Sequence, residues 1–493
     1  MRIATEISNL TNATPTDLLI VGLAEGTGVQ EGAIGSVDRA LNGAIRRAVT
    51  DGLITGKLGE TYLLSTAGAL PQPVVLVVGL GSPAKCDAHH VRQAAQAAGA
   101  AALALKPRTV STVAHGVGTN ELAAAAAVEA TLVATAYGLY RYTAYHSEPA
   151  VRVEALHLVS DDAGAQVTAA LRRARATWDG VEVARDLVNT PPADKRPMAL
   201  VARIQELGQQ FGFAVEVWDE KRLREIGAGG ILAVGRASSA PPAVVLMRLT
   251  GSEGEPLGLL GKGITFDAGG LQIKTAEGMR TMKSDMAGAA AVIGAMVALA
   301  QLERKTPVVA VAMCAENMIS GDAFRPGDIL RMLSGKTVEM ANADAEGRLV
   351  LADGVEILRR EKVRGVVDLA TLTGAQVVAL GDVRAGAISN DAALMEDVRQ
   401  ASELAGERIW EMPHDEDYRH LLDSRLADIR NVGSHGPGAG MITGGLFVGA
   451  FSEGLPWVHL DIAGPSFKET EKATGTPGGT GFGVQTLIRL LTD

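Results

Sequence analysis

The chain has 493 residues, and 46 Lys and Arg against 56 Asp and Glu give it a formal net charge of −10. Its content of 47% hydrophobic and 21% charged residues excludes a disordered chain and is enough for a large folded core. Only two cysteines are present, which excludes a disulfide scaffold and a cysteine-rich zinc module, and the acidic balance argues against nonspecific nucleic-acid binding.

The N-terminal stretch MRIATEISNLTNATPTDLLIVGL does not have the pattern of a signal peptide. The most apolar runs, at 73–80 and 306–314, are shorter than the ~20 residues that cross a bilayer. We therefore expect a cytoplasmic protein without a membrane segment.

The first third of the chain alternates between two kinds of segment. Val-, Leu- and Ile-rich segments at 19–23, 73–81 and 153–160 are predicted to be buried parallel strands. Ala-rich stretches at 89–105 and 120–142 are predicted to be helices. This alternation indicates an α/β domain. The Gly-Leu-Gly that ends 73–81 lacks the third glycine of a dinucleotide fingerprint, so it does not indicate a nucleotide site.

The stretch 163–192 is predicted to form one long helix that stops before Pro191 and Pro192. The helix stops there because the residue before a proline is disfavoured in the helical region. Beyond it the chain alternates again. The predicted helices are 284–304 and 346–361, and the predicted strands are 215–218, 231–236, 243–249, 257–266, 307–317, 364–373 and 457–464. The Gly-rich stretch 433–445 predicts a loop that leads into a helix.

These elements predict two α/β domains. The smaller N-terminal domain is expected at 1–160, a linking helix at 161–190, and the larger C-terminal domain at 191–493.

Two segments of the larger domain place charged residues in apolar, Gly-rich surroundings. GKGITFDAGG (261–270) follows an apolar strand, and we expect Lys262 and Asp267 at the carboxyl end of that strand, where open α/β sheets bind ligands. MKSDMAGAA (282–290) opens a helix with Asp285 near its first turn. An ordinary helix cap is the structural alternative for Asp285.

A third segment, NADAEGRLVLAD (342–353), carries Asp344 and Glu346 just ahead of a helix, with Arg348 beside them. Taken alone, this Asp-x-Glu pair could cap the helix or compensate its dipole.

The joint occurrence of four carboxylates and a lysine favours a metal site over capping. Several like charges cannot be packed at a buried site without a counter-charge, which hard divalent cations supply. Oxygen-rich sites with one nitrogen suit Zn²⁺, Mn²⁺, Mg²⁺ or Co²⁺. The zinc-protease motif H-E-x-x-H is absent, so any metal site must be built from carboxylates.

NADAEGRL, with GKGITFDAGG and MKSDMAGAA upstream, resembles the signature of the leucyl aminopeptidase (cytosol aminopeptidase) family of two-metal exopeptidases. Collinear blocks at family-like spacing extend the resemblance over about 184–493: ARDLVNTPP, AENMISGDAFRPGD, DLATLTGA, WVHLDIAG and GTGFGVQTLIRLL. The resemblance implies a variable N-terminal domain and a catalytic di-metal peptidase domain with a mixed central sheet flanked by helices. It also implies a homohexamer, a dimer of trimers, that acts on peptides with a free N-terminus.

The resemblance implies two divalent metal ions, Mn²⁺ or Zn²⁺, with Mg²⁺ or Co²⁺ as further candidates. The ligands of one ion would be Lys262, Asp267, Asp285 and Glu346, and those of the other Asp267, Asp344 and Glu346. Two such ions about 3.5–4 Å apart lower the pKa of a water molecule that attacks the scissile carbonyl.

The resemblance makes Lys274 and Arg348 the catalytic cations. Lys274 would stabilise the oxyanion that develops on the carbonyl oxygen. The planar fork of Arg348 suits a bidentate anion, and the family's bicarbonate, which serves as general base, would bind there. Lys262 could be a metal ligand only as a neutral amine, so nearby metal charge would have to depress its pKa.

By their positions within matching blocks, the residues that would line the pocket for the first substrate side chain are Met282, Thr371, Gly374 and Ala463. They are small or apolar, which favours Leu- or Met-like residues. Ordinary core packing is the alternative for Met282.

Three positions depart from the family's usual pattern. Ala268 stands where serine is common, and Ala343 stands where the signature has threonine, so hydrogen bonds around the ligands could differ. The loop after Pro192 reads ADKRP where the family more often has N-x-x-T-P, and no function is assigned to that change.

Two alternative functions share parts of this interpretation. Some bacterial family members also act as DNA-binding regulatory proteins, but this chain has no Lys/Arg-rich run. A Cys-Gly dipeptidase of glutathione turnover would use the same site, and only a substrate panel separates it from general peptide trimming.

Overall fold

The computed structural model describes residues 1–7, 10, 13–29, 31–147, 151–160, 164–433, 438–469 and 477–493. They form two compact units, one of Met1–Trp178 with Glu469–Pro477 and one of Asp179–Lys468 with Gly478–Asp493. The predicted two-domain α/β organisation is therefore confirmed. The division falls inside helix α5 (Ala165–Asn189), and the proposed boundaries at 160 and 190 stay a prediction. Residues 161–163 of the predicted linking helix lie outside the described residues.

The first unit is built on a six-stranded sheet with the order β1-β6-β5-β2-β4-β3, parallel except for β3. Its strands are β1 Arg2–Ile7, β2 Leu18–Ala24, β3 Thr61–Ser65, β4 Val74–Gly81, β5 Thr109–Thr112 and β6 Ala155–Ser160. The three predicted strands correspond to β2, β4 and β6, and the sequence interpretation missed the other three.

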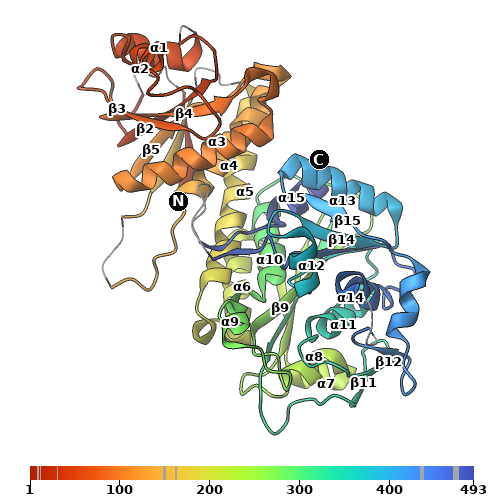
Figure 1. Cartoon of the computed structure of the whole chain (residues 1–493). Coiled ribbons are helices and arrows are strands. Elements are labelled where there is room, and N and C mark those ends of the chain that lie inside the picture. Colours follow the sequence, from red (N-terminus) through yellow and green to blue (C-terminus); the bar gives the residue numbers. More distant parts are fainter. Residues whose placement is uncertain are drawn as a thin grey trace. The chain divides into compact units, whose positions relative to one another are not determined.

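Helices cover both faces of this sheet, as a parallel sheet requires. They are α1 Gly32–Ala40, α2 Ala44–Thr50, α3 Ala88–Ala102 and α4 Ala124–Leu139, together with the first part of α5. Figure 1 shows α1 and α2 on one side of the sheet and α3 and α4 on the other. Alternate strand residues such as Leu19 and Val21 share a buried cluster with Ile45 of α2, which is the period-2 pattern of a strand between two layers.

The second unit contains an eight-stranded mixed sheet with the order β15-β14-β17-β13-β9-β10-β8-β7. The central strands β17, β13, β9 and β10 are mutually parallel, whereas β8 and β14 pair with them in the antiparallel direction. The strands are β7 Ala214–Trp218, β8 Ala243–Leu249, β9 Leu257–Asp267, β10 Val308–Asn317, β13 Gly365–Ala370, β14 Ala385–Ser389, β15 Ile409–Glu411 and β17 Trp457–Asp461. The implied mixed sheet is confirmed.

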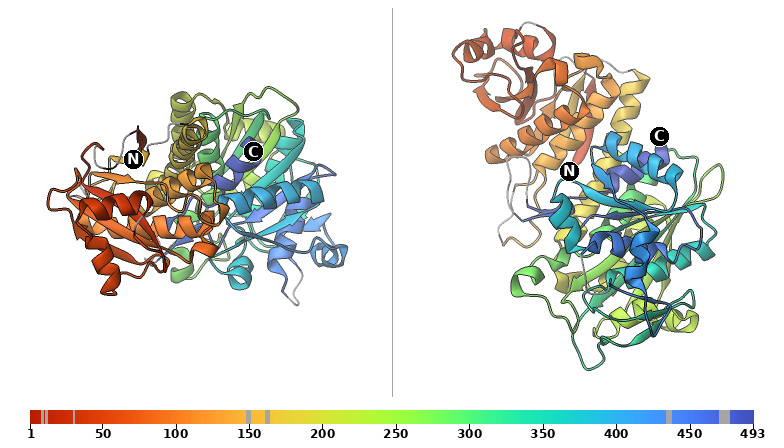
Figure 2. Two further views of the ribbon diagram at one scale, coloured as in Figure 1. Left: turned by 90° about the horizontal axis from the view of Figure 1, so that it is seen from above. Right: turned by 45° about the vertical axis from the view of Figure 1, so that its right-hand side comes forward.

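Helices flank this sheet as well (Figures 1 and 2). They are α6 Pro197–Phe211, α7 Glu220–Ile226, α8 Gly229–Gly235, α9 Ala276–Met279, α10 Ala287–Leu299, α11 Gly347–Arg360, α12 Gly374–Leu380, α13 Ala392–Ala405, α14 Gly440–Gly449 and α15 Val484–Thr492. Helix α10 packs on β9, β10, β13 and α15, and α11 packs on β9 and β10 and against α8 and α14. Short strands complete the unit: β11 Ile329–Arg331, β12 Thr337–Glu339, β16 Ile429–Arg430, β18 Phe467–Lys468 and β19 Gly478–Gly479.

One predicted strand is wrong. Residues 231–235 belong to helix α8, and Arg236 follows as its C-cap, so this segment is not a strand. A short apolar run fits a buried helix as well as a buried strand. Here a residue of another helix stabilises the helical form. The buried carboxylate of Asp353 on α11 accepts a hydrogen bond from Ile231 N, 3.0 Å away, in the first turn of α8.

Helix α14 begins inside the predicted Gly-rich loop, of which 434–437 lie outside the described residues. The segment Ala276–Leu299 is long and apolar enough to cross a membrane by length and composition, yet 89% of its apolar window is buried inside the fold. Its hydrophobicity is that of the core helix α10, which is buried along its whole length.

Candidate metal centre

The site lies where the four central parallel strands end. Asp267 is the last residue of β9, Asn317 the last of β10 and Asp461 the last of β17, and Thr371 follows β13. Parallel strands bring their carboxyl ends to one edge of the sheet, so these side chains meet although they are far apart in the sequence. Lys262 differs from its predicted place. It lies five residues before the end of β9, inside the strand, and only its side chain reaches the site.

Two glycines turn the chain away from the end of β9. Gly269 and Gly270 have φ of +88° and +58°, a region that residues with a Cβ adopt rarely. The amide of Gly269 donates a hydrogen bond to Asp267 Oδ1 at 2.8 Å, and this fixes the carboxylate. The turn then leads back to Lys274, whose side chain faces the same carboxylate.

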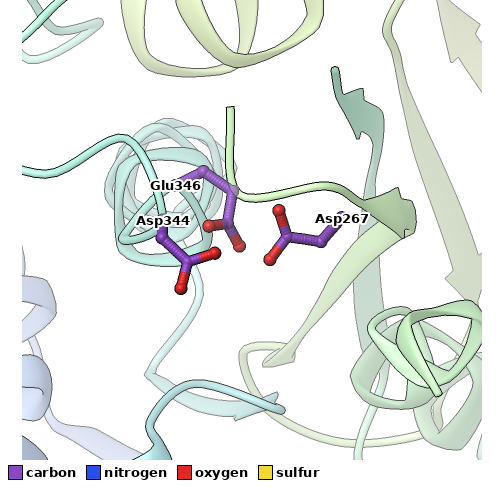
Figure 3. Close-up of side chains that lie close together, drawn as sticks. All are labelled: Asp267, Asp344 and Glu346. Atoms are coloured by element: carbon purple, nitrogen blue, oxygen red, sulfur yellow. The ribbon is translucent and has the colours of Figure 1, made fainter. Parts of the chain in front are cut away.

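Asp344 and Glu346 stand immediately before α11, and their carboxylates point towards that of Asp267 (Figure 3). One oxygen from each of the three carboxylates lies within 4.8 Å of the others. Glu346 is the residue that precedes α11, yet its side chain makes no capping hydrogen bond. The capping alternative for this residue is therefore wrong.

Asp285 is likewise not a cap. Its Oδ1 accepts hydrogen bonds from Lys262 Nζ at 2.7 Å and from Thr371 Oγ1 at 2.8 Å, and the residue before α10 is Met286. Asp285 lies at the end of the short turn 282–284 and is 4% exposed.

Two lysines neutralise part of the charge of the four carboxylates. Lys262 Nζ lies 2.7 Å from Asp285 and 2.9 Å from Glu346 Oε1, and it also donates to the Thr371 carbonyl oxygen at 2.8 Å. Lys274 Nζ lies 2.8 Å from Asp267 Oδ2 and also pairs with Asp344. The fold thus brings together all five predicted ligand residues and Lys274.

The pKa values of the buried carboxylates are shifted by burial and by the charges around them. Burial raises the pKa of Asp267 to about 6, and the negative charge of Glu346 adds to the rise. Burial also raises the pKa of Asp285 well above its usual value. For Glu346, burial acts upwards, but Lys262 and Lys274 together lower the pKa below its usual value.

The carboxylates around Lys262 favour its charged form. Burial acts to lower its pKa, but Asp285, Glu346 and Asp267 outweigh that effect and raise the pKa above its usual value. The neutral amine that a metal ligand needs is therefore not a property of the protein alone. It would require a cation among the carboxylates.

The chemistry of the donors fits divalent cations. Asp285 Oδ2 and Glu346 Oε2 are buried, and neither finds a hydrogen-bond partner among the residues that the structure describes. A buried carboxylate oxygen without a partner is costly unless a cation satisfies it. Four carboxylates against two lysines also leave a negative excess that divalent ions would offset.

Arg348 is the second residue of α11 and is 6% exposed. Its Nη1 donates to the Asn431 carbonyl oxygen at 2.7 Å, while its Nε finds no partner among the described residues. Burial lowers the pKa of Arg348 to about 10, against the opposing effect of Glu346 and Asp461, so the guanidinium is charged at neutral pH. A positive fork at the start of a helix is a suitable place for an anion.

The predicted pocket residues lie on neighbouring loops. Met282 begins the turn that ends at Asp285, and it is half-buried. Gly374 begins α12 and is exposed, and a Cβ built on it would meet no atom within 4 Å. Thr371 touches Asp285 directly, so it is more than a pocket wall. The side chain of Ala463 is half-buried. Their role as a pocket stays a prediction.

The sequence interpretation missed three polar residues that hold the site. Asn317 Nδ2 donates to Asp267 Oδ1 at 2.8 Å and to the Ala343 carbonyl oxygen at 3.0 Å. Asp461 accepts hydrogen bonds from the 372–373 backbone and from Ala463 N, and so joins two pocket loops. Asn431 Oδ1 accepts from the amides of 341 and 342. Asn317 and Asp461 could have been found, because each is a polar residue that ends an apolar strand. Asn431 gives no such signal.

Two of the three departures from the family pattern, Ala343 and Ala268, lie beside these contacts. Ala343 is fully buried, and its amide donates to Gln272 Oε1 at 2.5 Å. Ala268 N donates to the Asn317 carbonyl oxygen at 2.9 Å. The backbone amides of both residues are therefore held by hydrogen bonds next to the candidate ligands.

Comparison with known proteins gives a consistent result. The profile of the cytosol aminopeptidase family, catalytic domain, matches residues 182–488, and that of the family's N-terminal domain matches 20–149. A probable cytosol aminopeptidase of Alkaliphilus metalliredigens is 38% identical over 493 residues, covering 98% of this chain and 97% of the relative. One of Streptomyces griseus is 43% identical over 498 residues, covering 96% and 95%.

Two solved structures share the whole fold. The bottromycin maturation enzyme BotP in complex with Mn has a TM-score of 0.84 at 35% identity, covering 97% of this chain and 99% of that chain. A mutant of tomato leucine aminopeptidase has a TM-score of 0.85 at 31% identity, covering 99% and 96%.

Proposed function

The chain belongs to the cytosol aminopeptidase family and is an aminopeptidase, and from this premise we propose that it releases Leu- or Met-like residues from peptide N-termini at a site for two divalent ions. The family is metal-dependent. The observation that carries the proposal is the convergence of the Asp267, Asp344 and Glu346 carboxylates at the carboxyl edge of the sheet.

Each ion would use a different part of the carboxylate cluster. Lys262, Asp267, Asp285 and Glu346 would hold one ion, and Asp267, Asp344 and Glu346 the other. The unpaired oxygens of Asp285 and Glu346 support this division. Mn²⁺ and Zn²⁺ are the first candidates, with Mg²⁺ and Co²⁺ next. The bound ions would supply an activated water molecule and polarise the scissile carbonyl.

Lys274 and Arg348 would provide positive charge for the reaction. Lys274 contacts two of the proposed ligands, and its pKa is raised above the usual value, burial acting downwards and Asp267 acting upwards. A charged Lys274 next to the ligands is suited to stabilise an oxyanion. Arg348 would hold a bicarbonate that accepts the proton of the attacking water.

The pocket proposal concerns the first substrate residue. Met282, Thr371, Gly374 and Ala463 would border its side chain, and the open space above Gly374 supports room for an aliphatic group. A Cys-Gly substrate would use the same site.

The proposal also includes the oligomeric assembly and the cellular location of the protein. The assembly would be a homohexamer, a dimer of trimers, whose sites admit short peptides. Its location would be the cytoplasm, in keeping with relatives named cytosol aminopeptidases. Light scattering of the active protein tests the assembly, and a fully active stable monomer would contradict it.

The decisive experiment compares the protein with Glu346→Gln and with Glu356→Gln. Glu356 is a buried glutamate on the same helix that pairs with arginines outside the site. Each protein is dialysed, its metal content measured, and hydrolysis of leucine anilide, Leu-Gly, Cys-Gly and N-acetyl-leucine anilide followed with Mn²⁺ or Zn²⁺. We expect E346Q to lose metal and hydrolysis while E356Q keeps both, and the blocked substrate to resist. A metal-restored wild-type protein without N-terminal hydrolysis refutes the proposal.

A further inference from the structure

The ADKRP segment that departs from the family pattern contains a buried lysine with an unusual environment. Lys195 is 2% exposed. Its Nζ donates to three backbone carbonyl oxygens, those of Leu187 at 2.9 Å, Val188 at 2.8 Å and Lys283 at 2.6 Å. An ammonium group has three N–H donors, and here all three are used.

A second lysine makes the reciprocal contact. Lys283 lies in the turn 282–284, and its Nζ donates to the Asn189 carbonyl oxygen at 3.0 Å. The two lysines therefore link the same two segments in opposite directions. Lys195, in the loop after α5, donates to the backbone of the turn, and Lys283, in the turn, donates to the backbone at the end of α5. The last carbonyl groups of a helix lack helical partners and carry negative partial charge, so two cations suit this end of α5.

The pair is costly, which argues against an incidental contact. Burial lowers the pKa of Lys195 well below its usual value, and the charge of Lys283 lowers it further. No carboxylate forms an ion pair with either lysine in the part of the chain that the structure describes. Backbone carbonyl oxygens offset the desolvation of both lysines, and Lys283 Nζ also lies over the ring of Phe467, 6.0 Å from its centroid.

The turn that these lysines hold ends at Asp285. Lys283 precedes Asp285 by two residues, and the carboxylate of Asp285 must meet Lys262 and Thr371 at 2.7–2.8 Å. A three-residue turn has little independent freedom once one of its carbonyl groups and one of its side chains are fixed. The end of α5 therefore sets where Asp285 stands.

We propose that Lys195 and Lys283 form a clamp that positions Asp285 for one of the two metal ions, an inference that rests on the proposed function. Asp285 is a ligand of only one ion, so the clamp acts on that ion alone. The ion held by Asp267, Asp344 and Glu346 receives no ligand from the clamped turn. Lys195 and Lys283 are positioning residues, because neither touches the reacting atoms.

The test uses the full-length protein with Lys195→Met and Lys283→Met, and Lys336→Met as the matched control. Lys336 also donates to a backbone carbonyl oxygen, that of Ala450 at 2.6 Å, but lies on the loop between β11 and β12. Mn²⁺ is titrated into each apoprotein and followed by calorimetry and electron paramagnetic resonance, which distinguishes a single Mn²⁺ from a spin-coupled pair.

We expect the wild type to bind two Mn²⁺ per subunit and K336M to match it. In K195M and K283M one of the two affinities should fall about 10–100-fold, the range for residues that orient ligands, while the other stays unchanged. The spin-coupled signal should then give way to that of a single ion at intermediate Mn²⁺. Because the two lysines hold one contact, the double variant should lose less than the product of the two single losses.

The alternative outcomes are distinct. A lower unfolding temperature with both Mn²⁺ affinities unchanged assigns the lysines a structural role and overturns the inference. Equal weakening of both ions also overturns it. If K195M does not fold, K283M, whose side chain is less buried, decides the question. A wild type that binds no Mn²⁺ pair refutes the proposed function itself, before the variants are compared.

Discussion

Replacing Gly347 with alanine puts a methyl group against the side chain of Lys262. A Cβ at this position would lie 2.6 Å from Lys262 Cε and 2.8 Å from both Cδ and Nζ. Ordinary contacts begin near 3.4 Å, so the lysine must move by roughly 0.6–0.8 Å. Its side chain is 3% exposed and holds three polar contacts of 2.7–2.9 Å, so it has no free direction in which to move.

The same substitution at Gly354 is the matched control. Gly354 lies seven residues further along α11, and a Cβ there would meet Leu260 Cδ1 at 2.4 Å and Met313 Sδ at 3.2 Å, away from the carboxylates. Gly354 lies inside α11, so G354A gains up to ~1 kcal/mol of helix propensity, and Gly347 is the first residue of α11, so G347A gains less. Both variants lose ~1–3 kcal/mol through overpacking, which is the larger effect. Their stabilities should therefore be similar, and only G347A should disturb the site.

We expect G347A to bind Mn²⁺ about 10–100-fold more weakly than G354A, with a comparable loss in kcat/KM on leucine anilide. Metal content after dialysis against graded Mn²⁺, urea unfolding and initial rates measure the three quantities. If G347A keeps metal affinity and rate within twofold of G354A while its unfolding free energy is unchanged, the contact does not hold Lys262, or Lys262 is not a ligand.

Further predictions address charge, metal and pH. Lys274→Ala should keep both metal ions and lose about 10²–10³ in kcat, the typical effect of removing an oxyanion donor, and loss of metal from K274A would show that the role is wrongly assigned. Chelation should abolish hydrolysis but leave the circular dichroism spectrum unchanged, because Lys262 and Lys274 still neutralise part of the carboxylate charge; unfolding on chelation would contradict this. Burial lowers the pKa of His115 in the first unit to about 4, against 6.5 when exposed. Between these two pH values the folded state therefore binds fewer protons than the unfolded state. The free energy of unfolding should fall as the pH drops from 6.5 to 4, by up to ~3 kcal/mol. Hydrogen exchange of β5 and α4 amides at pH 7 and 5 measures this loss, which His115→Gln should reduce and the exposed His420→Gln should not.

The sequence singled out the candidate ligand residues because carboxylates stand out where their surroundings are apolar and rich in glycine. Asp267 ends an apolar strand, Asp344 and Glu346 precede an apolar helix, and the family signature joins them. Such residues are costly to bury, so their occurrence in these segments already indicates a counter-charge. The strands of the central sheet were predictable for a similar reason, since their continuous apolar runs suit positions buried on both faces.

Only the tertiary structure decided which side chains meet. No local sequence pattern predicts the order of the strands in the sheet. Asn317 contacts Asp267 because β10 lies beside β9, and this neighbourhood is known only from the fold. The helix at 229–235 shows the same limit, because an apolar run adopts whichever form its neighbours stabilise, and here Asp353 stabilises a helix.

Lys195 shows the difference most clearly. By sequence it is one lysine in a loop, and lysines in loops are ordinarily solvated. The fold instead places it between the last carbonyl groups of α5 and the turn before Asp285. Sequence identifies the residues that can bind a metal because that ability is a property of each side chain, whereas the residues that hold them in place are defined by distances that exist only after folding.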